Sequence, residues 1–244
     1  MKQIFAVQTE ADFQKYLTFV HKIQSRLDDY LAFLKSNYQV IDLPRCILWT
    51  DCDTATRLIS DIPVPAYTND YRTVFCPDLE VWKKIYLHQL DAEYDEEIRR
   101  YYEGSLTKNH ILQILGHEFV HHSAWFSDDD SNRVSGIWFE EGMCEYISRR
   151  YFLTESEFDE SILINQKLTG YLHKRYGSAS LESFETAVYQ GDYAGILYWY
   201  WRSFLAVRKL VDSHCGDVPA VFAKYQDWVK ACCTTPLARW FHLE

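Results

Sequence analysis

Two histidines and a glutamate near the middle of the chain have the spacing H-E-x-x-H, at His117, Glu118 and His121. Imidazole and carboxylate groups bind Zn²⁺, and a site with three protein ligands leaves one position for water. A carboxylate that does not bind the metal can accept a proton from that water. The pattern therefore predicts metal-assisted hydrolysis, with His117 and His121 as ligands and Glu118 as the general base.

The residues around this motif predict a helix over 107–122, because apolar side chains recur at helical spacing. His117 and His121 are four residues apart, so both side chains leave the same face one turn apart. Gly116 precedes the first histidine. A glycine costs a helix about 1 kcal/mol relative to alanine, so we expect a packing or functional reason for it.

A second helix, predicted over 137–151, carries the expected third ligand, Glu141. Glu145 lies one turn further along the same face, where its carboxylate can accept the N–H of a ligand histidine and orient the ring. Glu140 is the competing ligand, but it points about 100° away from Glu141 on a helix. We favour Glu141 because Gly142 follows it and Glu145 then falls one turn on.

These residues together resemble the gluzincin branch of the zincin metallopeptidases, which includes thermolysin-like and aminopeptidase-like enzymes. The resemblance rests on His117, Glu118, His121, Glu141 with the following Gly142, and the acidic Glu145. It implies a zincin-like α+β fold, one Zn²⁺ and peptide-bond hydrolysis.

Two neighbouring families fit less well. Ala124 and Ser127 stand where metzincins have glycine and a third histidine, and Cys144 follows the motif, whereas the cysteine ligand of peptide deformylases precedes it.

The resemblance also implies a tyrosine that stabilises the oxyanion, at the start of a helix after the third ligand. Tyr193, in the run Tyr193-Ala194-Gly195, is our candidate. An aromatic stripe at helical spacing is usually core, so a structural role for this tyrosine is the alternative. Other candidates are Tyr198, Tyr200, His173 and His214.

An edge strand above the active-site helix pairs with extended substrate in zincins. By that resemblance we assign the role to the predicted strand 73–76, with Thr73, Val74 and Phe75 as the substrate-binding residues. The substrate would add to the strand through main-chain hydrogen bonds. A plain interior strand is an equally good interpretation.

Along the chain, one long helix is predicted over 10–36, strands over 46–50 and 73–76, and a helix from 79 to about 90 capped by Asp78. Beyond residue 109 the pattern is almost entirely helical, over 107–123, 137–152, 155–176, 180–188, 193–213, 217–230 and 235–242. We therefore expect an α+β, zincin-like fold. Residues 1–125 form a small lobe with a mixed sheet, residues 126–244 form a helical lobe, and the active-site helix lies between them.

Composition narrows the range of partners. The chain is 48% hydrophobic with a formal net charge of −10, which indicates a globular protein and argues against nucleic acid or an anionic membrane surface as a partner. The first residues lack the apolar run of a signal peptide, and Arg202 interrupts the most apolar stretch. Seven dispersed cysteines without C-x-x-C spacing fit reduced thiols, so we expect a cytoplasmic protein that acts on a peptide or protein substrate. The acidic run Asp128–Asp130 is a weak calcium candidate.

Rival functions keep the same motif. The chain could be a zinc-dependent peptide-binding or regulatory module, or a hydrolase of a non-peptide amide or ester. Zinc could also be purely structural, which would require four protein ligands, with His122 as the first candidate for the fourth. Glu118 favours catalysis, because a binding module has no need of a general base.

Overall fold

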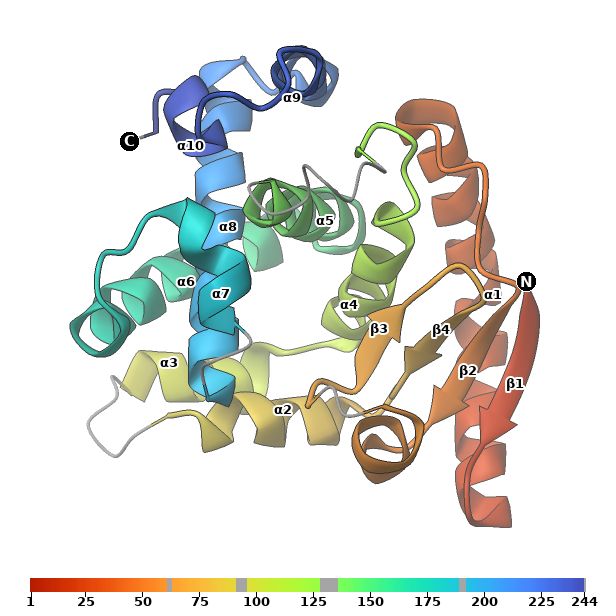
Figure 1. The fold of residues 1–244 in the computed structure, drawn as a ribbon. Helices are drawn as coiled ribbons and strands as arrows, with labels where there is room; N and C mark the ends of the chain where they lie inside the picture. The colour runs from red at the N-terminus through yellow and green to blue at the C-terminus, as the bar shows by residue number, and fades with distance from the viewer. Residues whose placement is uncertain (61–62, 91–95, 128–135, 189–191, 244) are drawn as a thin grey trace. The chain divides into compact units, whose positions relative to one another are not determined.

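The computed structural model describes residues 1–60, 63–90, 96–127, 136–188 and 192–243 (Figure 1). Within them the protein combines many helices with a small mixed sheet, which confirms the predicted α+β class. The chain separates into two compact units, one of residues 1–93 and 102–124, the other of residues 94–101 and 125–244. The sequence-based division placed residues 94–101 in the first part.

The first unit contains the sheet. Its strands are β1 (Lys2–Ala6), β2 (Cys46–Thr50), β3 (Ala66–Thr68) and β4 (Arg72–Phe75), in the spatial order β1-β2-β4-β3. The first three strands in that order run parallel, whereas β3 runs antiparallel to β4. The sequence predicted β2 with these bounds and β4 one residue later, but neither β1 nor β3.

Helix α1 (Glu10–Tyr38) connects the parallel neighbours β1 and β2 and lies along one face of the sheet (Figure 1). It begins after Thr9, whose side chain accepts the N–H of Asp12 at 3.1 Å, as a helix N-cap does. Phe19 packs edge-on against Trp49 of β2, with ring centroids 6.1 Å apart. The residues that α1 buries follow helical spacing: Tyr16, Val20, Ile23, Leu27, Tyr30, Leu34 and Tyr38.

The remaining elements of the first unit follow the sheet strands. A π-helical segment, η1 (Thr54–Ile59), comes after β2, and α2 (Leu79–His88) comes after β4. Asp78 caps α2 by accepting the N–H of Glu80 at 3.1 Å, and it also pairs with Lys15 of α1. A second π-helical segment, η2 (Tyr101–Ser105), precedes α4 (Lys108–Val120), which contacts α1 and β3.

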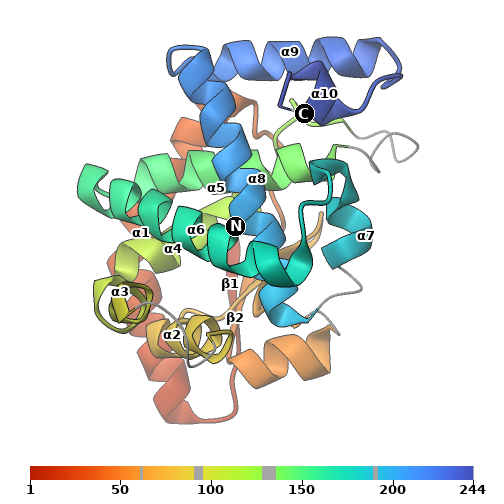
Figure 2. The same ribbon diagram turned by 90° about the vertical axis from the view of Figure 1, so that its left-hand side faces the viewer.

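The second unit is helical. Its described helices are α3 (Glu96–Arg100), α5 (Ile137–Phe152), α6 (Glu155–Tyr176), the short η4 (Leu181–Ser183), α7 (Phe184–Val188), α8 (Tyr193–Ser213), α9 (Val218–Lys230) and α10 (Leu237–Trp240). Helix α8 crosses α5 and α6 (Figures 1 and 2). Phe139 of α5 stacks on Tyr225 and on Phe241, with centroids 4.6 and 5.5 Å apart, which builds an aromatic core around α9 and α10. The bounds predicted for α6 and α8 are confirmed.

Candidate functional site

Helix α4 carries the H-E-x-x-H motif, and its start is fixed by a capping box. The hydroxyl of Thr107 accepts the N–H of Asn109 at 3.2 Å, and Nδ1 of His110 accepts the N–H of Thr107 at 3.1 Å. Histidine here takes the place that glutamate or glutamine usually has in such a box. The predicted helix is therefore confirmed with Thr107 as its N-cap, but it ends at Val120 and not at residue 122 or 123.

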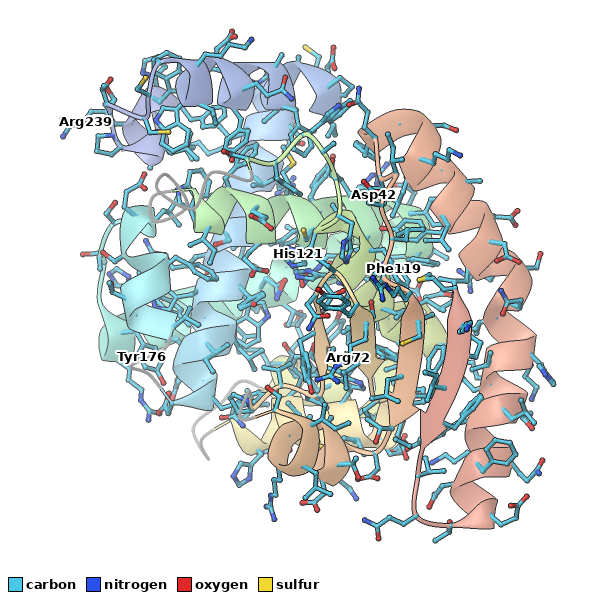
Figure 3. All side chains as sticks on the ribbon, turned by 45° about the vertical axis from the view of Figure 1, so that its right-hand side comes forward. Asp42, Arg72, Phe119, His121, Tyr176 and Arg239 are labelled. Carbon is cyan, nitrogen blue, oxygen red and sulfur yellow. The ribbon has the colours of Figure 1, made fainter. Side chains whose placement is uncertain are left out.

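The two histidines of the motif lie against each other at the end of α4. Figure 3 labels His121. Their Nε2 atoms are 3.1 Å apart, and His117 is buried. A tetrahedral zinc ion with Zn–N bonds of about 2.0–2.1 Å places two nitrogen ligands about 3.3 Å apart. The same separation suits a single N–H···N hydrogen bond between the rings. The pair therefore fits two corners of a zinc tetrahedron with little movement.

Glu118 and Gly116 flank His117 and are both buried in the interior part of α4. The carbonyl of Gly116 accepts a hydrogen bond of 3.1 Å from the hydroxyl of Tyr30, on α1. This bond ties the first turn of the motif to the longest helix of the first unit. This hydrogen bond uses the main-chain carbonyl, which every residue has, so a specific reason for glycine at position 116 stays a prediction.

His122, the residue after the motif, faces the sheet. Its Nε2 lies 2.9 Å from Oγ1 of Thr68 on β3, and that oxygen lies 3.0 Å from Oγ1 of Thr73 on β4. A nitrogen engaged with a threonine hydroxyl is not available to a metal ion. This contact engages one of the two ring nitrogens of His122, and the structural-zinc alternative stays a prediction.

The expected substrate strand is wrong. Thr73, Val74 and Phe75 belong to β4, which lies between β2 and β3 and is fully buried at these positions. A strand with a ladder on each side has no main-chain groups left for a peptide. The interior-strand interpretation holds, and β3 is the antiparallel strand at that end of the described sheet.

In the second unit, Glu141 lies on α5, and the glycine after it makes a close helix crossing possible. A Cβ on Gly142 would lie 2.5 Å from the carbonyl oxygen of Ser203 and 2.6 Å from Cγ2 of Val207, both on α8. The helix interface therefore explains Gly142. Glu141 is buried, whereas the competing ligand Glu140 is half-buried.

Glu145 pairs with a residue that the sequence analysis did not single out, Arg149. Its Oε2 accepts Nε of Arg149 at 2.7 Å and Nη2 at 2.6 Å, and Nη1 donates to Oδ1 of Asn165 at 2.7 Å. The guanidinium also lies over the ring of Phe204, 4.1 Å from its centroid. A glutamate followed four residues later by arginine on a helix was the available signal. That Glu145 also orients a ligand histidine stays a prediction.

A group of side chains among the described residues could hold a metal ion: His117, His121 and Cys144. Cys144 is fully buried on α5, three residues after Glu141. Thiolate, like carboxylate, is a common zinc ligand beside two imidazoles. Cys144 therefore joins Glu141 as a candidate for the third metal ligand. From the sequence, Cys144 was considered only as the cysteine ligand of a peptide deformylase, for which it lies on the wrong side of the motif.

Three of the alternatives to Tyr193 as an oxyanion donor are Tyr198, His214 and His173. The hydroxyl of Tyr198 donates to the carbonyl of Gly177 at 2.8 Å, and burial raises the pKa of this phenol. Nδ1 of His214 lies 2.8 Å from the carbonyl of Leu210 at the end of α8, and His173 is exposed on α6.

Tyr193 itself is the first residue of α8, whose N-cap is Asp192. Asp192 accepts the N–H of Gly195 at 2.9 Å and pairs with Arg175 at 2.5 Å, so the backbone that presents Tyr193 is fixed. Tyr200 makes a ring contact with Phe184, with centroids 5.5 Å apart. That Tyr193 is the oxyanion donor stays a prediction.

No family model, curated protein or solved structure matches this chain. None of the helices in the described ranges has the length and apolar character needed to cross a bilayer. The calcium candidate Asp128–Asp130 lies outside the described residues.

Proposed function

We propose that the protein is a zinc-dependent peptidase of the gluzincin type with a zincin-like fold. His117 and His121 supply two ligands, and α5 supplies the third, through Glu141 or Cys144. The observation that carries this proposal is the pair of Nε2 atoms 3.1 Å apart on one helix, with a buried glutamate between the two histidines in sequence. When bound, Zn²⁺ polarises a carbonyl and lowers the pKa of a coordinated water toward ~7.

Glu118 is the general base in this proposal. Its carboxylate accepts a proton from the attacking water and later delivers that proton to the nitrogen that leaves when the C–N bond breaks. The hydroxyl of Tyr193 donates a hydrogen bond to the developing oxyanion, a contribution of about 3 kcal/mol where such a donor is well placed. Glu145, held by Arg149, would keep a ligand imidazole in orientation.

An extended peptide would add to β3, not to β4. Among the described residues, β3 has a strand partner on one side only, and it contacts α4. Main-chain hydrogen bonds along an edge strand bind peptides with little demand on side-chain identity. The negative formal charge of the chain suits neutral or cationic peptides.

The deciding experiment combines metal analysis of the purified chain with cleavage of a peptide library, with and without a chelator. We expect one zinc per chain and cleavage that chelation abolishes and added Zn²⁺ restores. Cleavage that survives removal of the metal would contradict the mechanism. Stoichiometric zinc without cleavage of any peptide would favour a hydrolase of a non-peptide amide or a binding module.

The third donor is identified by comparing Glu141→Gln with Cys144→Ser. Loss of a direct ligand should weaken zinc binding by more than the 10–100-fold typical of losing an outer contact. Replacing zinc by Co²⁺ gives a second readout, because a thiolate ligand adds a strong near-ultraviolet charge-transfer band that a carboxylate does not. If both variants keep wild-type affinity, the third ligand does not come from these two residues.

A further inference from the structure

The C-terminal end of α4 is connected to strand β3 through the side chain of His122. Nε2 of His122 lies 2.9 Å from Oγ1 of Thr68, the last residue of β3. Oγ1 of Thr68 lies 3.0 Å from Oγ1 of Thr73, its register partner on the interior strand β4. The three groups form a chain from the helix, through the outer strand, to the buried centre of the sheet.

The segment that carries His122 is itself fixed. The hydroxyl of Ser123 donates to the carbonyl of Tyr38 at the end of α1, and the N–H of Ala124 donates to the carbonyl of Gln39 at 3.3 Å. Ser123 also forms an isolated bridge with Val40. His122 therefore projects from backbone that is held against α1. Its hydrogen bond to Thr68 can restrain the position of that residue.

Strand β3 needs such support because it is short. It spans three residues and pairs with β4 alone among the described strands. Short segments at a sheet edge open at low cost, so side-chain contacts decide how well they are held. A hydrogen bond from the residue next to His121 sets the position of β3 relative to the histidine pair.

We infer that His122 is a positioning residue that clamps β3 to α4 and thereby sets the register in which an extended peptide pairs beside the histidines. The role in peptide binding rests on the proposed function. Either proton arrangement serves the clamp. Thr73 can donate to Thr68 while Thr68 donates to His122, or His122 can donate to Thr68 while Thr68 donates to Thr73. Glutamine, which reaches about as far as Nε2 and can donate or accept, should replace His122.

The kinetic test uses His122→Ala and Thr68→Val, with His122→Gln as the conservative control. For an extended quenched-fluorescent peptide from the library, we expect KM to rise about fivefold to tenfold and kcat to stay within about twofold. A short blocked peptide with the same cleaved bond should show no change in KM, and zinc content should stay at the wild-type level. His122→Gln should restore most of the affinity, and the double variant should be no worse than either single one.

A second measurement, hydrogen exchange of backbone amides, does not depend on activity. Both single variants should speed exchange at Tyr67 and Asn69, whose N–H groups face β4, by about tenfold, while exchange in β1 and β2 stays the same. A general loss of stability would instead raise exchange in all strands and would change kcat and KM for both peptides.

The outcomes separate the two proposals. If the wild type cleaves peptides but His122→Ala keeps its KM, the inference is overturned and the proposed function stands. If the wild type cleaves no peptide, the proposed function and the role in peptide register fail together. In that case faster exchange at Tyr67 and Asn69 still supports the clamp, and unchanged exchange overturns it.

Discussion

Two helices of this protein each carry a polar pair at a spacing of four residues, and the two pairs differ in kind. On α4, His117 and His121 bring two Nε2 atoms to 3.1 Å. On α5, Glu145 and Arg149 bring opposite charges to 2.6 Å, and Asn165 completes the arrangement. The second pair joins a base to an acid, so it is satisfied by protein groups alone. The first joins two imidazoles, which can share one N–H···N hydrogen bond when neutral and repel each other if both are protonated.

This difference separates a structural from a chemical reason for burying polar groups. Folding alone accounts for the α5 pair, because the ion pair and the amide compensate the cost of burial. For the α4 pair, the proposed function adds a metal ion that would accept both nitrogen lone pairs. Changes at the motif on α4 should therefore alter zinc binding or turnover, and changes to the Glu145–Arg149 pair on α5 should alter stability.

The largest expected effect is that of Glu118→Gln on turnover. Glutamine keeps the shape of the side chain but cannot accept the proton, so kcat should fall by about 10²–10⁴-fold while zinc content and stability are retained. Asp29→Asn, at an exposed position on α1, is the matched control and should leave kcat unchanged. If Glu118→Gln stays active after contaminating proteases are excluded, Glu118 is not the general base.

Next in size is the loss of stability from Arg149→Met. The side chains of Arg149 and Glu145 are 10% and 14% exposed, so the variant leaves a nearly buried carboxylate without its cation. We expect the free energy of unfolding to fall by about 3–5 kcal/mol, measured by chemical denaturation. Adding Glu145→Gln should recover much of that loss. A cost below about 1 kcal/mol would place the pair among surface ion pairs and weaken the comparison.

Gly142→Ala tests the packing of α5 on α8. The new Cβ would meet the Ser203 carbonyl at 2.5 Å, so the helices must shift, at a cost of about 1–3 kcal/mol of unfolding free energy. Gly170→Ala on α6 is the control, since nothing lies within 4 Å of its Cβ position. There alanine should stabilise the helix by about 0.5–1 kcal/mol. If both variants shift stability in the same direction, the close crossing at Gly142 is not what selects glycine.

The smallest effect is expected for Tyr30→Phe, which removes the hydrogen bond to the carbonyl of Gly116. One buried hydrogen bond contributes about 1 kcal/mol to the free energy of unfolding. Tyr71→Phe, at an exposed position, should change stability by less than about 0.5 kcal/mol. Equal effects of the two variants would show that the hydrogen bond from Tyr30 to Gly116 adds nothing measurable to the free energy of unfolding.

The helices were predictable because their signals are local. Periodic apolar residues and the caps at Thr107 and Asp78 lie within one turn of the structure they determine. Strand β3 was missed because Ala66–Thr68 is too short to show alternation, and its conformation depends on pairing with β4. The place of β4 inside the sheet was misjudged for the same reason.

The sequence by itself determined the H-E-x-x-H spacing, the helix beneath it and the shared face of its two histidines, because four residues on a helix always return to the same side. Only the tertiary structure decided that β3 rather than β4 forms the antiparallel end of the sheet, that His122 faces Thr68, and that Arg149 of α5 donates to Asn165 of α6. Such pairings join segments distant in the chain or depend on which side chains the fold buries, and nothing in a local pattern specifies them.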